Sequence, residues 1–579
     1  MKQLVYPALV LSLLGSVGKA QNTAARPGAA QPNAAQPGAA QPGYSDHSEL
    51  SARLKALASR TGNTATVRSI GKSGSGKDIW LLTIGRGVAE RKPALALVAG
   101  LDGTHLAGTE LAVQVAESLL TGTSDSINRV LDTKTIYVLP LLNPDAQAQA
   151  FAKLRYERSG NASATDDDRD GRVDEDPVDD LNRDGLITQL RVEDPTGQYV
   201  ASKDDARVLV RADPARGESG RYILLSEGID ADKDGQFNED GAGGVALDKN
   251  FTFDYPFFTA GAGEMPVSEP ENRALLDFLG KAPNVYAVLT FGPYNNLSDA
   301  PKFDRTKTAK RIVTGLLEKD AVVGEQVSKL YNAQTALTGA PAMPATKGNF
   351  AQTAYYHHGR FSFSTPGWWA PSVKAAVSAR KDSAATAPKA APAPGKSAES
   401  DNDDLRFLKW ADANGLTDVY VNWTPIEHPD FPGRKAEVGG LVPFAKHNPP
   451  IRFLTDNARK HTQFVTALAT RMPQIELANV RTETLGGGLH RISAQVVNRG
   501  LMPTGSEMGE RVRWVPKMRV ELKLADKQTV VSGRRVMLRG PMAAGETMDV
   551  TFLVSGNGRV TLEAGNAMTG VQQQEINLK

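Results

Sequence analysis

Apolar and polar residues alternate in two patterns along this chain of 579 residues, and the pattern changes near residue 473. Apolar residues recur at helical spacing over Ser48–Ser59 and again over Glu110–Leu120. Short apolar runs that begin at Ile79, Leu95 and Ile136 have the length of buried strands. This alternation of strands and helices predicts an α/β fold with a mixed or parallel sheet.

The residues after Pro473 show the two-residue period of strands with one buried face. His490–Val497 and Met518–Leu524 alternate in this way, and turns that contain glycine and proline separate such runs. The pattern predicts a β-sandwich domain over residues 473–579. No titratable cluster with catalytic spacing occurs there, so binding or packing is the expected role of this domain.

The first twenty residues have the pattern of a signal peptide. Lys2 supplies a positive charge, Leu4–Val17 is apolar, and Gly18–Ala20 places small residues before a cleavage site. The apolar run is short for a membrane span, which favours cleavage after Ala20. We therefore predict a secreted or periplasmic protein with no membrane span after signal cleavage.

Two low-complexity segments delimit the predicted domains. Residues 21–43 repeat Ala, Pro, Gln and Gly, with too few large apolar groups to pack, and are expected to form a disordered linker. A segment rich in Ala, Pro, Ser and Lys, at about 374–404, is expected to be a loop insertion. It interrupts a main domain that we place at residues 44–472.

Composition restricts the partners and the sources of stability. The chain has 40% hydrophobic and 23% charged residues, as soluble globular proteins do. Signal cleavage removes Lys2 and Lys19, which leaves as many basic residues as the 65 acidic ones, so no footprint for nucleic acid is present. The chain contains no cysteine, which excludes disulfides and thiolate metal sites. We expect a monomer held by core burial and by metal ions.

Six short motifs are spaced along the predicted main domain. They are Ser69–Ser73, Gly100–Gly108, Asn143–Asp145, Gly244–Phe251, Ser268–Glu271 and Glu437–Gly440. In this order they resemble the carboxypeptidase A-like zinc metallopeptidase family. The resemblance implies an α/β/α sandwich around a mixed eight-stranded sheet, which in this chain precedes the C-terminal β-sandwich.

The resemblance also indicates where the zinc ligands of the family would lie. The family uses a His-x-x-Glu loop and a later histidine. Asp102 and His105 occupy the two loop positions with the residue types exchanged, and Gly292, after the apolar run Tyr286–Phe291, occupies the third. Glycine offers no ligand, and a catalytic zinc normally takes three protein ligands. A zinc ion would therefore be held weakly.

The remaining functional positions of the family are also replaced. Pro366 stands where the family has its general-base glutamate, and proline cannot accept a proton from water. Asp248 and Lys249 stand where the family has an Asn-Arg pair that grips the substrate carboxylate. A carboxylate at Asp248 would repel such a ligand, and lysine lacks the fork of arginine.

These replacements predict a catalytically inactive peptidase homologue whose cleft still binds a peptide or a cell-wall fragment. One alternative is an active metallocarboxypeptidase that uses Asp102, His105 and a further ligand. Another is an interaction protein that acts through its C-terminal β-sandwich. Three other histidines, His357, His358 and His428, are expected to be structural residues.

Three acidic stretches between the zinc loop and the carboxylate clamp suggest a second metal. Each has oxygen-bearing side chains at alternate positions before a glycine, as calcium loops do. None closes with the glutamate of an EF-hand; Arg191 and Gly241 stand at that position in the second and third. Carboxylates this close together repel unless a cation binds, so we predict a structural calcium role for Asp166, Asp168, Asp170, Asp174, Asp180, Asn182, Asp184, Asp230, Asp232, Asp234 and Asn238.

Overall fold

The computed structural model describes residues 43–165, 178–231, 233, 235, 237, 244–371 and 402–579. The predicted signal peptide, residues 21–42 of the linker and residues 374–401 of the insertion lie outside this part. The last residues assigned to the insertion begin helix α9 instead, because the Asn402 side chain accepts hydrogen bonds from the amides of Asp404 and Leu405. No helix in the described ranges has the length and apolarity to cross a membrane.

The main domain is built on a mixed six-stranded sheet. Its strands, in spatial order, are β1 (Ala65–Lys72), β2 (Asp78–Ile84), β4 (Thr135–Leu139), β3 (Ala94–Ala99), β9 (Val285–Phe291) and β10 (Phe361–Thr365). β1, β2 and β4 pair antiparallel, whereas β4, β3, β9 and β10 pair parallel. The carboxyl ends of β3, β9 and β10 therefore lie at one edge of the sheet.

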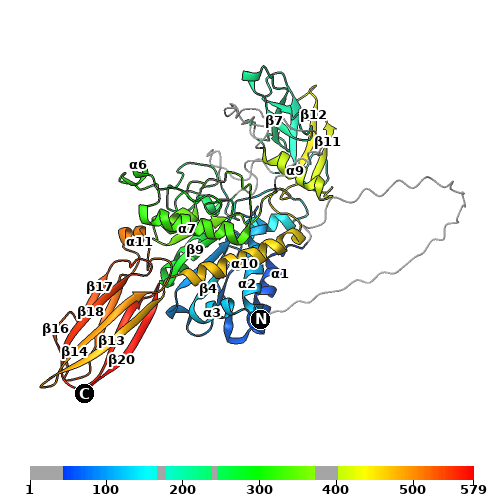
Figure 1. Ribbon diagram of the computed structural model, residues 1–579. Coiled ribbons are helices and arrows are strands. Elements are labelled where there is room, and N and C mark those ends of the chain that lie inside the picture. Colours follow the sequence, from blue (N-terminus) through cyan, green and yellow to red (C-terminus); the bar gives the residue numbers. More distant parts are fainter. Residues whose placement is uncertain are drawn as a thin grey trace, which may run out of the picture. The chain divides into compact units, whose positions relative to one another are not determined.

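Helices cover both faces of this sheet. Every residue of β3 is buried: Leu95 and Leu97 pack into one core, and Ala96 and Val98 into the other. Residues of six helices join the first core: α1 (His47–Arg60), α2 (Leu106–Thr121), α3 (Asp125–Thr133), α7 (Glu318–Thr335), α9 (Asp403–Ala413) and α10 (Leu454–Arg471). Residues of α5 (Pro270–Lys281) and α8 (Phe350–Tyr356) join the second. α10 packs beside α2 and α7 (Figure 1).

This arrangement confirms the predicted α/β/α sandwich with a mixed sheet, although six described strands form the sheet rather than eight. Later strands pair elsewhere: β12 pairs with β5, so that Ala436 lies opposite Val192. A second, antiparallel sheet results, in the order β11 (Tyr420–Ile426), β12 (Ala436–Leu441), β5 (Gln189–Glu193), β8 (Tyr222–Ser226), β6 (Tyr199–Ala201) and β7 (Leu209–Arg211).

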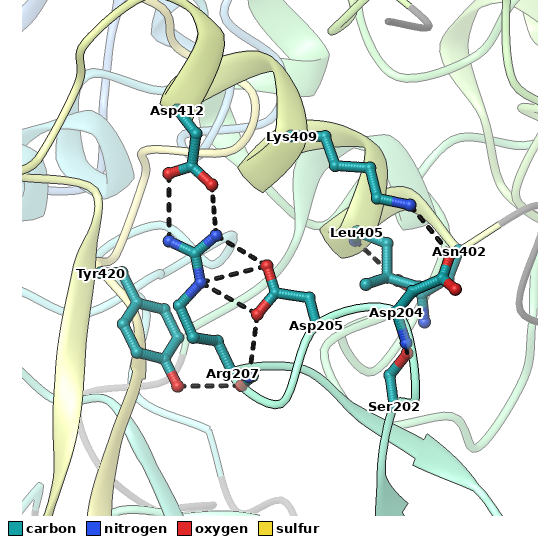
Figure 2. A network of polar contacts seen from close by, with 9 residues as sticks. All are labelled: Ser202, Asp204, Asp205, Arg207, Asn402, Leu405, Lys409, Asp412 and Tyr420. Atoms are coloured by element: carbon teal, nitrogen blue, oxygen red, sulfur yellow. Dashed lines mark hydrogen bonds and ion pairs between the residues drawn. The ribbon is translucent and has the colours of Figure 1, made fainter. Parts of the chain in front are cut away.

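A polar network joins the second sheet to helix α9 (Asp403–Ala413). Figure 2 shows Arg207 bound by the carboxylates of Asp205 and Asp412, while Lys409 reaches Asp204 at 2.8 Å. Arg207 offers its planar fork to two carboxylates at once, which fixes orientation better than a single ion pair would. The loop between β6 and β7 is thereby held against α9.

The C-terminal residues form two four-stranded antiparallel sheets around one core, which confirms the predicted β-sandwich. One sheet contains β13 (Ile475–Gly486), β14 (Leu489–Asn498), β18 (Thr547–Ser555) and β16 (Thr529–Ser532). The other contains β17 (Val536–Arg539), β15 (Met518–Lys523), β19 (Gly558–Asn566) and β20 (Gly570–Leu578). The described residues also form three short α-helices, α4 (Pro144–Gln147), α6 (Arg305–Thr308) and α11 (Glu507–Val512).

Candidate functional site

Asp102 and His105 lie in the loop that leaves the carboxyl end of β3. The His105 amide donates to the Asp102 carbonyl at 3.2 Å, and α2 begins at the next residue. One carboxylate oxygen of Asp102 accepts hydrogen bonds from the amide and the hydroxyl of Thr104, at 2.9 and 2.8 Å. That oxygen therefore shapes the loop and is not a free metal ligand.

The His105 side chain is turned into the protein. It is only 6% exposed, and its ring lies against Gly108, where a Cβ atom would come within 2.8 Å of Nδ1. Burial lowers the pKa of His105, while the Asp102 carboxylate and the carbonyl groups of Pro366 and Phe291 act in the opposite direction. Neither ring nitrogen makes a well-aligned hydrogen bond within the described chain. The ring is thus a neutral, buried imidazole.

Gly292 and Pro366 follow the neighbouring strands β9 and β10. The Gly292 amide donates to the Thr365 carbonyl at 3.1 Å, which ties the two strand ends together. A Cβ atom at Gly292 would contact only the Thr290 methyl group, at 3.6 Å. Space for a side chain therefore exists at this position, but glycine puts no ligand atom there.

The residues at this sheet edge do not fit a three-ligand zinc site. Among the described residues, no three His, Cys, Asp or Glu side chains lie together in a way that would hold a metal ion. One Asp102 oxygen is held by Thr104, the His105 ring is turned inward against Gly108, and Gly292 has no side chain. A catalytic zinc needs three protein ligands and an open position, so we derive no chemical step through zinc.

Asp248 and Lys249 are adjacent in the chain but differ in their surroundings. The Asp248 carboxylate accepts hydrogen bonds from the Asn349 side chain at 2.7 Å and from the Phe350 amide at 2.9 Å. It therefore caps the start of α8 and is not free to face a ligand. The Lys249 ammonium group contacts the Ala260 carbonyl at 3.4 Å and lines a cavity.

Asp248 should make stability fall as the pH rises. Burial raises its pKa to about 7, and the charge of Asp102 adds to this, although hydrogen bonds from Phe350 and Asn349 oppose it. The native carboxyl then holds its proton in a pH range where the unfolded one has lost it. Between pH 5 and pH 8, unfolding should become easier by about 2 kcal/mol. Urea unfolding at several pH values measures the free energy of unfolding. If that free energy depended on pH in the same way for the wild type and for Asp248→Asn, the prediction would be contradicted.

The cavity that Lys249 lines has a volume of about 500 Å³, and strand residues of the second sheet form part of its wall. Its walls come from residues 156–160, 187–189 and 441–443, with further contributions from 260–261. Arg158 and Lys446 supply two more positive charges. Lys446 pairs with Asp404 at 2.8 Å, whereas the guanidinium of Arg158 donates to the carbonyls of Gly160 and Asn161. Neither Asp102 nor His105 is among the described residues that line this cavity.

Sequence reasoning missed several of these groups. Arg158 and Lys446 belong to none of the motifs, and only their place after the Asn143–Asp145 and Glu437–Gly440 motifs points to the site. His447 was missed as well: burial, Lys446 and the nearby His105 together lower its pKa to about 4. It adds a second neutral imidazole close to His105.

The three histidines expected to be structural are bound within the protein. His357 contacts the Thr252 hydroxyl at 2.7 Å, and the His358 ring lies 5.6 Å from that of Trp514. His428 is buried and contacts the Gly228 carbonyl at 2.8 Å. Among the described residues, no interaction links any of these three histidines to Asp102.

The acidic stretches are only partly within the described residues. Asp166, Asp168, Asp170, Asp174, Asp232, Asp234 and Asn238 lie outside them. In the second stretch, the Asp180 carboxylate accepts hydrogen bonds from the Asp184 and Gly185 amides at 3.1 and 2.8 Å. Burial and the charge of Asp180 raise the pKa of Asp184. In the third, one oxygen of Asp230 is buried without a partner in the described chain.

Comparison with known proteins decides the family. The family model described as zinc carboxypeptidase matches residues 50–368, which is more than half of the chain. The chain belongs to the zinc carboxypeptidase family. A second model, described as a domain of unknown function, matches residues 474–577 of this zinc carboxypeptidase-family protein.

Individual relatives match only parts of it. Carboxypeptidase M of Mus musculus is 28% identical over 107 residues, which are 18% of this chain and 24% of that protein. Carboxypeptidase D of Homo sapiens is 29% identical over 132 residues, which are 22% of this chain and 10% of that protein. The chain thus spans a quarter or less of these relatives. A solved structure of bovine thrombin-activatable fibrinolysis inhibitor in complex with tick carboxypeptidase inhibitor has a TM-score of 0.35 at 12% identity, covering 74% of this chain and 96% of that one.

Proposed function

We propose that this protein is a catalytically inactive zinc carboxypeptidase homologue that binds the carboxylate end of a peptide or cell-wall fragment. The observation that carries the proposal is the contrast between two neighbouring regions. The sheet edge with Gly292 and Pro366 lacks a ligand and a base, whereas the cavity that Lys249 lines has a volume of about 500 Å³ and holds three cationic side chains against the carboxylates of Glu157 and Asp404.

The loss of catalysis follows from the chemistry of the replaced positions. Hydrolysis in this family would need a zinc-bound water and a base that removes its proton. Gly292 and Pro366 supply neither a ligand atom nor a proton acceptor, and His105 is buried and is not among the described residues that line the cavity. A bound peptide would therefore not be cleaved.

Retention of binding rests on the charges of the cavity. Neither Arg158 nor Lys249 forms an ion pair with an acidic side chain in the described part of the chain. Two cations without acidic partners favour an anionic group on the ligand, and hydrogen bonds to a charged carboxylate are strong. Asp248 does not oppose this, because its oxygens face Asn349 and Phe350.

Metal content and peptide binding, measured on the same preparation, test the proposal. The protein should contain far less than one zinc per chain after dialysis against micromolar zinc, and calorimetry should detect binding of a hexapeptide with a free carboxylate. One tightly held zinc per chain would contradict the inactive assignment. No heat of binding would contradict the retained cleft.

The proposal extends to location, domains and calcium. We propose that residues 1–20 direct export, that residues 44–472 form the binding domain, and that residues 473–579 form a separate accessory domain. Calcium would then be supplied outside the cell and would bind the acidic stretches. Val178 and Gly244, which flank those stretches, line the cavity, so calcium would also support the binding site.

Calcium removal should lower the melting temperature. Asp180 and Asp184 repel one another when no cation offsets their charge, and ions that bind only the native state stabilise it. We expect a fall of several degrees in excess EGTA, which added calcium but not magnesium restores. Asp180→Asn combined with Asp184→Asn, which removes two ligands of the second stretch, should reduce the response. Scanning calorimetry measures the melting temperature. A melting temperature that changes with neither EGTA nor calcium would exclude a calcium role.

A further inference from the structure

A second cavity adjoins the one that Lys249 lines. It has a volume of about 540 Å³ and shares Ala260 and Gly261 with the first. A ligand that extends past these two residues would pass from one cavity into the other. Phe257 and Phe258 line the second cavity, and they are 63% and 81% exposed. Exposed aromatic side chains beside a cavity are typical of binding surfaces.

The loop that carries these two rings is held in an unusual conformation. Asp254, Phe258 and Val267 have φ angles of 47°, 63° and 60°. The left-handed region is unfavourable for phenylalanine and for a β-branched residue, and such strain persists only where surrounding contacts enforce it.

Contacts beneath the loop enforce this conformation. The buried Asn250 side chain donates to the carbonyls of Ala262 and Met265, at 2.7 and 3.0 Å. The Val267 amide donates to the Asn250 carbonyl at 2.7 Å, and the Tyr255 hydroxyl donates to the Ala262 carbonyl at 3.1 Å. The rings are thus presented from a rigid base, which reduces the entropy lost when a ligand binds.

The orientation of the rings favours a side chain over a sugar. The Phe257 ring meets the Tyr255 ring edge-on, with 4.8 Å between the ring centroids. Its centroid lies 6.3 Å from that of Phe258, and the planes of these two rings are inclined by 48°. The exposed rings therefore form a wedge and not a flat stacking face. A wedge of aromatic rings accommodates an aromatic or aliphatic side chain, whereas a flat pyranose ring stacks on one open face.

We propose that Phe257 and Phe258 form a second subsite, which binds an apolar side chain of a peptide whose carboxylate end lies in the cavity of Lys249. This inference rests on the proposed peptide-binding function and specifies the ligand. The ligand is an extended peptide with an aromatic or large aliphatic residue upstream of its terminus. Each extended residue spans about 3.3–3.6 Å, so the subsite would be one to a few residues from the terminal carboxylate.

The second subsite can be tested on the full chain with four labelled hexapeptides that have a free carboxylate. Each consists of glycine with one phenylalanine, which stands at a different position before the last residue. Fluorescence anisotropy should show that one of them binds the wild type about 10-fold more tightly than hexaglycine. Phe257→Ala and Phe258→Gly should remove this preference while leaving the affinity for hexaglycine unchanged. Glycine suits the left-handed φ at residue 258, so Phe258→Gly should keep or raise the melting temperature. Phe303→Ala, which removes a 40% exposed ring outside both cavities, should retain the preference.

The possible outcomes separate this inference from the proposed function. Equal binding of all five peptides by the wild type, or a preference that survives both variants, would overturn the second subsite alone. Binding of an N-acetylglucosamine oligomer that Phe257→Ala abolishes would assign the wedge to a glycan instead. A wild-type chain that binds none of the peptides would contradict the proposed function and this inference with it.

Discussion

The Lys249→Glu variant is expected to bind a hexapeptide with a free carboxylate about 30-fold more weakly than the wild type, as charge-assisted hydrogen bonds of this kind are worth about 2 kcal/mol. Lys249 lines the cavity, and among the described residues the Ala260 carbonyl is the one hydrogen-bond partner of its ammonium group. Reversing its charge removes an attraction and adds a repulsion. Isothermal titration calorimetry measures the change.

Two comparisons isolate the carboxylate contact. The same peptide with an amidated terminus should bind the wild type weakly and should be nearly insensitive to Lys249→Glu. Lys281→Glu makes the same change of net charge on the exposed face of α5, where Lys281 pairs with Asp277 at 3.4 Å, and should bind like the wild type. Equal affinity of Lys249→Glu and wild type for the free carboxylate would contradict the proposed site.

The Asp320→Ala variant is expected to lose about 4 kcal/mol of unfolding free energy, because two buried donors and one half-buried donor lose their shared acceptor. The Asp320 side chain, on α7, is 3% exposed. It accepts hydrogen bonds from the Tyr355 hydroxyl at 2.8 Å and from the amides of Glu507 and Met508 at 2.8 and 2.9 Å. Those amides begin α11, which belongs to the C-terminal segment, so one carboxylate links it to the main domain.

Urea unfolding followed by tryptophan fluorescence measures this loss. Asp320→Asn keeps one acceptor oxygen and should lose less than Asp320→Ala. Asp277→Ala, which removes a 71% exposed carboxylate from a helix surface, should change the unfolding free energy by less than about 0.5 kcal/mol. An Asp320→Ala variant within about 1 kcal/mol of the wild type would contradict the role of this residue as a link between the domains.

The central elements of the fold could be predicted from the sequence because their patterns are local. The run at Leu95 is buried on both sides, and β3 lies in the middle of the sheet. The alternation after Pro473 likewise corresponds to a sandwich with one core. Strand pairing is not local: nothing in the sequence of Ala436–Leu441 shows that it pairs with Gln189–Glu193 in a second sheet.

The candidate site could be predicted by residue type but not by side-chain environment. The sequence shows that Gly292 offers no ligand and that Pro366 offers no base. It does not show that His105 turns inward against Gly108, or that the Asp248 carboxylate caps α8. The direction of the His105 ring depends on how the residues around it pack, and the Asp248 contact joins two residues that are far apart in the sequence. Both are therefore visible only in the folded structure.

Incubation of the hexapeptide with zinc-supplemented protein, followed by mass spectrometry, tests the central claim most directly. The peptide concentration should exceed the measured dissociation constant, so that the cavity is occupied throughout. We predict that the peptide remains intact after a day, because neither Gly292 nor Pro366 can support hydrolysis. Release of the carboxyl-terminal residue would show that this chain is an active carboxypeptidase, provided that phenanthroline and the Asp102→Ala substitution each prevent it.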